Sequence, residues 1–159
     1  MTDFRALLQG LAVNQVKFIV IGGAAAIAHG SAQLTQDLDI VYERSATNLD
    51  RLVAALSPYE PYLRGVPLGL PFRWDTATLS RGLNFTLTTA IGDIDLFGEI
   101  PGGGAYEQLA PAALHIQVFG LSCLCLSIPQ LIRAKRSAGR PKDLQAISEL
   151  EAIAGESAE

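Results

Sequence analysis

Two aspartates separated by one residue, Asp37 and Asp39, are the first feature of this sequence that could carry chemistry. They lie in the segment 37–42, Asp-Leu-Asp-Ile-Val-Tyr, whose composition is typical of a strand. Side chains at positions i and i+2 of a strand share a face, so both carboxylates would point the same way. They would repel each other unless a cation lay between them, and carboxylate oxygens are ligands that Mg²⁺ prefers. The alternative without a metal is a solvated pair at an exposed strand edge.

A second pair, Asp93 and Asp95, repeats this spacing further along the chain. Residues 83–89 alternate apolar and polar, and residues 93–97 follow Ile-Gly, which predicts a hairpin. Asp93 directly follows a glycine and is expected in the turn, so we expect Asp95 to be the third carboxylate beside the first two. Three acids could hold two metal ions about 3.5–4 Å apart, or supply a base for an attacking hydroxyl.

A glycine pair, Gly22-Gly23, separates the β-branched segment 17–22 from the alanine-rich segment 24–28. This order predicts a strand, a tight turn and the start of a helix. Backbone N–H groups in such a turn can approach a phosphate, although a tight turn without a ligand is the alternative.

Five of the twelve basic residues lie between positions 133 and 142. Either they lie on a solvent-exposed face of a helix, or they neutralise the phosphate charge of a triphosphate or an RNA.

The elements that must position these residues combine helices and strands. Apolar spacing predicts helices over 4–11 and 49–56, and apolar runs predict strands over 17–22, 37–42, 116–119 and 121–126. Ser127 and Gln130 have the spacing of a capping box that opens a helix to about residue 137, and Pro141 begins the last helix. Residues 58–81 have poor periodicity and are expected to form an irregular connection. The pattern predicts an α/β (α+β) fold, a mixed β-sheet flanked by helices, with C-terminal helices.

Composition narrows the class of protein further. The chain has 159 residues, of which 49% are hydrophobic and 18% charged, which excludes disordered and coiled-coil chains. A net charge of −4 argues against general coating of nucleic acid, and two cysteines are too few for a disulfide framework. No signal peptide and no apolar run of about 20 residues is evident. We therefore expect one cytoplasmic domain over residues 1–159, with its core at about 16–150 and no membrane association.

Several of these motifs together resemble a known superfamily. Ile21-Gly22-Gly23 and the segment 37–40, Asp-Leu-Asp-Ile, look like the signature of the DNA polymerase β-type nucleotidyltransferases. The resemblance is closer to the minimal bacterial nucleotidyltransferases related to the AbiEii-type abortive-infection toxins. That branch shares His29-Gly30, Thr35 and a Lys-x-x-x-Gly-Arg-x-Lys-Asp-Leu segment, here residues 135–144. The similarity extends from about residue 16 to residue 150.

The resemblance implies a fold, an activity and a set of site residues. The fold would be that of the nucleotidyltransferases, and the activity a Mg²⁺-dependent transfer (Mn²⁺ is the alternative metal) of a nucleoside monophosphate from a nucleoside triphosphate, of the EC 2.7.7 type. The implied catalytic and metal-binding residues are Asp37, Asp39 and Asp95, and the implied nucleotide-binding residues are Gly22, Gly23 and Lys135.

The acceptor and the biological role stay open at this point. In the resembling families the acceptor is a tRNA, a partner protein or a small-molecule hydroxyl, and a role as a toxin–antitoxin component is one expectation. One position departs from the pattern, because the branch usually carries arginine where this chain has Gln33. The alternative function is therefore a catalytically silent nucleotide- or partner-binding module on the same fold.

Overall fold

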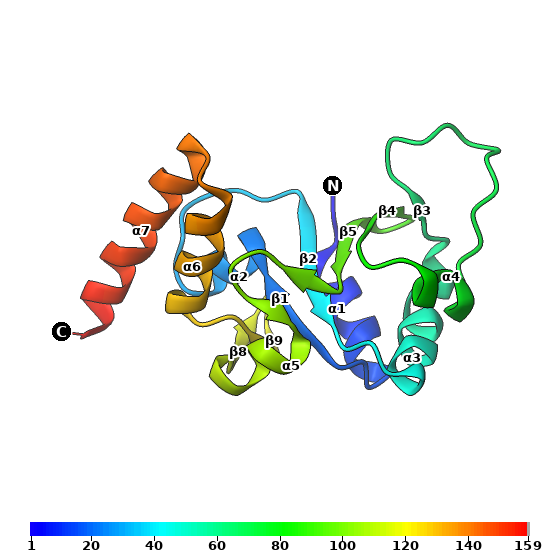
Figure 1. Ribbon diagram of the computed structural model, residues 1–159, viewed down its shortest axis with the longest axis horizontal. Coiled ribbons are helices and arrows are strands. Elements are labelled where there is room, and N and C mark those ends of the chain that lie inside the picture. Colours follow the sequence, from blue (N-terminus) through cyan, green and yellow to red (C-terminus); the bar gives the residue numbers. More distant parts are fainter. Residues whose placement is uncertain (159) are drawn as a thin grey trace.

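The computed structural model describes residues 1–158 and contains a seven-stranded mixed sheet flanked by helices (Figure 1). The strand order is β3-β4-β5-β2-β1-β9-β8. The strands of this sheet are β1 (Phe18–Ile21), β2 (Asp37–Tyr42), β3 (Tyr62–Leu63), β4 (Phe85–Thr89), β5 (Gly92–Phe97), β8 (Leu114–Val118) and β9 (Leu121–Cys125). A separate small ribbon pairs β6 (Glu99–Ile100) with β7 (Gly104–Ala105). The expected fold class is confirmed.

Seven α-helices accompany the sheet within residues 1–158. They are α1 (Phe4–Val13), α2 (Gly22–Ala28), α3 (Ala46–Leu56), α4 (Thr76–Arg81), α5 (Tyr106–Leu109), α6 (Ile128–Ala138) and α7 (Pro141–Ala158), with short 3-10 turns at Ser57–Tyr59 and Ala110–Ala112. Helices α6 and α7 pack against each other at one end of the molecule, and α3 and α4 lie at the other end (Figure 1). Strands β2 and β5 run between these two ends.

In both strands that carry the aspartates, the residues that alternate with them are apolar and buried. Leu38 and Ile40 of β2, and Ile94 and Leu96 of β5, are fully buried in the hydrophobic core. The aspartates occupy the alternate positions, so they lie on the opposite face of the sheet. Burial of the apolar side therefore fixes the register of both strands and gathers the aspartates on the other side.

Helix boundaries follow the local sequence. Ser127 caps α6 by accepting a hydrogen bond from the backbone N–H of Gln130, and the Gln130 side chain accepts one from the Ser127 backbone, which is the expected capping box. Gly139 ends α6 in the left-handed conformation, with φ of 67°.

Within residues 1–158, no helix combines the length and the hydropathy that a membrane crossing requires.

Two local expectations are wrong. The segment 58–81 is not wholly irregular, since it contributes the edge strand β3 and helix α4, whose first turn is capped by Asp75. Asp93 does not lie in a turn, because β5 begins one residue earlier, at Gly92. The positive φ of Gly92, 126°, completes the turn before the strand, so that Asp93 is a paired strand residue.

Candidate active site

Four aspartates form a two-by-two array on the outward face of β2 and β5. The two strands are parallel, and their register pairs Asp37 with Asp93 and Asp39 with Asp95. Residues paired across neighbouring strands have side chains on the same face, so all four carboxylates gather within a small area. The third acid of the sequence prediction, Asp95, is thus directly beside Asp39.

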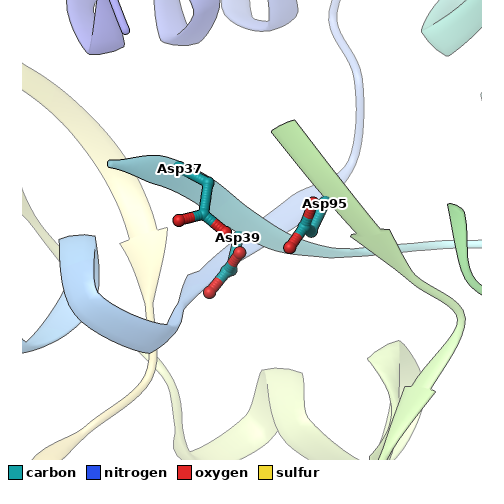
Figure 2. A group of neighbouring side chains, drawn as sticks. All are labelled: Asp37, Asp39 and Asp95. Atoms are coloured by element: carbon teal, nitrogen blue, oxygen red, sulfur yellow. The ribbon is translucent and has the colours of Figure 1, made fainter. Parts of the chain in front are cut away.

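Three of these acids converge closely enough to hold a metal ion. Asp37, Asp39 and Asp95 each offer a carboxylate oxygen, and the three oxygens lie within 4.8 Å of one another. Figure 2 shows the three side chains pointing toward a common space from two adjacent strands. The Oδ1 atom of Asp39 is buried and has no hydrogen-bond partner among residues 1–158. Such an atom is costly to bury alone, and a divalent cation would satisfy it, so the residues present fit a metal.

The environment of these carboxylates disfavours their ionised forms. Burial, followed by the charges of Asp37 and Asp95, raises the pKa of Asp39 from 3.8 to about 8. Burial also raises the pKa of Asp95, against the opposing effect of Arg64. Without a metal, the site is therefore an electrostatically unfavourable part of the fold.

This cost predicts that Asp39→Asn stabilises the metal-free protein. The pKa of Asp39 is higher in the folded than in the unfolded state, so the unfolding free energy falls as pH rises between about 4 and 8. At pH 8 we expect the neutral asparagine to raise stability by about 2 kcal/mol, or roughly 4–8 °C in Tm. At pH 5 the difference should be much smaller. Thermal melts in EDTA at both pH values measure it, and equal Tm differences at the two pH values would contradict this explanation.

The glycine turn lies against the acids. Gly22 is the first residue of α2 and has a φ of 63°, a conformation that suits glycine. A Cβ atom at this position would overlap the carboxylate of Asp39, and one at Gly23 would lie 2.6 Å from the Thr35 hydroxyl oxygen. Both positions therefore need glycine for close approach, Gly22 to the acids and Gly23 to the loop before β2.

A groove of about 350 Å³ extends from this turn to the C-terminal helices. Lys135 of α6 lines it together with Gly22 and Gly23, and its ammonium lies 3.6 Å from Asp143 of α7. The Asp143 side chain is only 1% exposed and also accepts a 2.6 Å hydrogen bond from the Arg140 Nε, which holds the pKa of that carboxyl below its usual range. Asp143 thus pairs both with Lys135, which lines the groove, and with Arg140.

One residue of the site, Arg64, was not expected from the sequence. It follows β3 and forms ion pairs with Asp37, Asp93 and Asp95. Sequence analysis missed it because β3 has only two residues and lies in the segment without periodicity. The one available signal was indirect, namely that four clustered acids require a counter-charge. Gln33, which stands where the resembling branch carries arginine, is exposed at the groove that Lys135 lines.

Comparisons with known proteins identify the fold. No family model matches the chain, and no curated protein matches its sequence. Among solved structures, the chain is similar to the lincosamide antibiotic adenylyltransferase LnuA in its lincomycin-bound form, with a TM-score of 0.59 and 16% sequence identity. The match covers 96% of this chain and 98% of that chain. The chain therefore has the fold of a nucleotidyltransferase, as the resemblance in its motifs implied.

Proposed function

We propose that the protein is a metal-dependent nucleotidyltransferase that uses a nucleoside triphosphate, with ATP the first candidate. The observation that carries the proposal is the convergence of three carboxylates around the unpartnered Oδ1 of Asp39, beside a glycine turn that opens into a groove. The same fold in an adenylyltransferase supports it.

The residues of the chain take distinct parts in this proposal. Asp37, Asp39 and Asp95 would hold Mg²⁺ or Mn²⁺, which neutralises phosphate charge and polarises the α-phosphate when bound. The acceptor hydroxyl oxygen forms a bond to the α-phosphorus, the bond to the β-phosphate oxygen breaks, and pyrophosphate leaves. Asp95, beside Asp39 on the neighbouring strand, would accept the hydroxyl proton. Gly22, Gly23 and Lys135 would bind the triphosphate.

The acceptor is proposed to be a hydroxyl of a small molecule. LnuA is a lincosamide adenylyltransferase that was solved with lincomycin bound, so lincomycin is the first acceptor to test. The assay follows transfer of the label from α-³²P ATP to the acceptor in the presence of Mg²⁺, with tRNA as a parallel acceptor. Labelled lincomycin supports a small-molecule acceptor, whereas labelled tRNA would favour the toxin-related branch. Tight Mg–ATP binding without product from any acceptor would favour the silent binding module that Gln33 suggested.

The groove makes a prediction of its own. We expect Lys135→Met to weaken Mg–ATP binding about tenfold, because the variant loses a charge-assisted contact with phosphate. Arg136→Met is the matched control, since Arg136 is the next residue of α6 and its side chain is 64% exposed and paired with Glu151. Isothermal titration with ATP and Mg²⁺ compares the two variants. Equal effects of the two substitutions would show that only the overall charge of α6 matters.

A further inference from the structure

Arg64 is aligned across the strands of the sheet with two of the metal-site acids, Asp95 and Asp39. Its backbone N–H donates to the carbonyl of Thr86 on β4, at 3.0 Å. Thr86 pairs with Asp95 on β5, which in turn pairs with Asp39 on β2. The Arg64 side chain extends across β4, where Nη2 donates to the Leu87 carbonyl, and reaches Asp95 on β5 from the edge of the sheet.

The guanidinium contacts three of the four aspartates. Its Nη2 donates to Oδ1 of Asp95 in the closest contact, Nε lies 3.5 Å from Oδ2 of Asp93, and Nη1 lies 3.7 Å from Oδ2 of Asp37. In the described part of the chain, no other lysine or arginine forms an ion pair with these acids. Arg64 is therefore their resident counter-ion.

A divalent metal at the three carboxylates would compete with this arginine. Arg64 contacts two of the three cluster acids, Asp95 most closely and Asp37 at 3.7 Å, so Asp95 is the main carboxylate that both cations share. The guanidinium and the metal are also both positive, and they repel each other at the distances that the cluster allows. We therefore expect metal binding to weaken the contact between Arg64 and Asp95.

The contacts of Arg64 are suited to displacement. Its side chain is 28% exposed, and its Nε is buried without a hydrogen-bond partner among residues 1–158. Leu87 gives Nη2 a carbonyl acceptor at 3.0 Å that does not depend on the acids. A Cβ atom on the following residue, Gly65, would meet no atom of the described chain within 4 Å.

We propose that Arg64 is a positioning residue that competes with the divalent metal for Asp95 and thereby sets the metal affinity of the site. This inference rests on the proposed function, because it takes the three carboxylates as metal ligands. In the metal-free protein Arg64 neutralises part of the acidic array. On metal binding it gives up Asp95 and keeps its contacts with Asp93 and the Leu87 carbonyl.

The test is a Mn²⁺ titration of the metal-free protein, followed by the electron paramagnetic resonance signal of free Mn²⁺. We expect Arg64→Gln to bind Mn²⁺ about tenfold more tightly than the wild type, since a nearby positive charge is removed. Arg73→Gln is the control, because Arg73 is 88% exposed and, within residues 1–158, its one ion pair is with Asp75. Its Mn²⁺ affinity should equal that of the wild type.

A double substitution separates competition at Asp95 from a general charge effect. In an Asp95→Asn background, Arg64→Gln should change the Mn²⁺ affinity less than twofold, because the closest shared carboxylate is gone and only the 3.7 Å pair with Asp37 is left. If Arg64→Gln does not fold, Arg64→Lys replaces it: lysine keeps the charge but cannot contact three carboxylates, so affinity should rise by about threefold. Equal or weaker Mn²⁺ binding by these Arg64 variants would overturn the proposal while leaving the metal site intact. Absence of Mn²⁺ binding in every protein would overturn the metal site, and with it the proposed function.

Discussion

Replacing Asp39 with asparagine is expected to abolish metal binding and to lower nucleotidyl transfer at least about a thousandfold. Asp39 is the most deeply buried acid of the cluster, and its Oδ1 has no other partner in the described chain. An amide carries no charge and cannot balance a divalent cation there. The loss is measured by Mn²⁺ titration, which needs no acceptor, and by release of pyrophosphate with the acceptor that the labelling assay identifies.

The matched control is Asp93→Asn, which removes the same charge from the same face of the sheet. Asp93 contributes no oxygen to the three-carboxylate cluster, and its side chain is 35% exposed. We expect this variant to change transfer less than tenfold. The metal-free Asp39→Asn protein is also expected to unfold at a higher temperature than the wild type. A variant that is more stable but inactive has lost catalysis without losing its fold. A folded Asp39→Asn protein with wild-type transfer would contradict the assignment.

Gly22→Ala is expected to have the second largest effect. Its φ of 63° lies in the left-handed region, where alanine is strained, and the added methyl group would overlap the Asp39 carboxylate. Asp39 must then move away from Asp37 and Asp95. We expect the unfolding free energy to fall by about 1–3 kcal/mol and Mg–ATP binding to weaken at least tenfold. Urea denaturation and isothermal titration measure the two effects.

Gly69→Ala distinguishes strain from displacement of the acid. Gly69 also has a positive φ, 97°, but a Cβ atom there would meet nothing within 4 Å. This variant should lose about 1 kcal/mol of stability and keep the Mg–ATP affinity of the wild type. If Gly22→Ala binds Mg–ATP as well as Gly69→Ala does, the close approach of Gly22 to Asp39 has no part in binding.

Local sequence patterns predicted that the aspartates share a face of the sheet, but they did not predict Arg64, the residue that neutralises them. The i, i+2 spacing of Asp37 and Asp39 depends only on strand periodicity, and so does the capping box at Ser127. The partner strand of β2 could not be predicted in register, because that pairing is set by burial of Leu38 and Ile94 in the shared core. The position of Asp93 was misjudged for the related reason that strand ends depend on their partners.

Arg64 shows the limit of sequence analysis most clearly. Its strand, β3, has two residues and exists because it pairs with β4, more than twenty positions away along the chain. Neither periodicity nor composition identifies so short an edge strand. The contact with Asp95 depends on this pairing and on the register of β4 against β5, so it follows only from the folded sheet.

The central claim is that a divalent metal on these aspartates binds the nucleotide. The most direct test is an isothermal titration of ATP into the protein with and without Mg²⁺, repeated for the double variant Asp37→Asn/Asp39→Asn. We predict ATP binding that requires Mg²⁺ in the wild type and is lost in the double variant. ATP binding of equal strength in EDTA, or undiminished in a folded double variant, would contradict the claim.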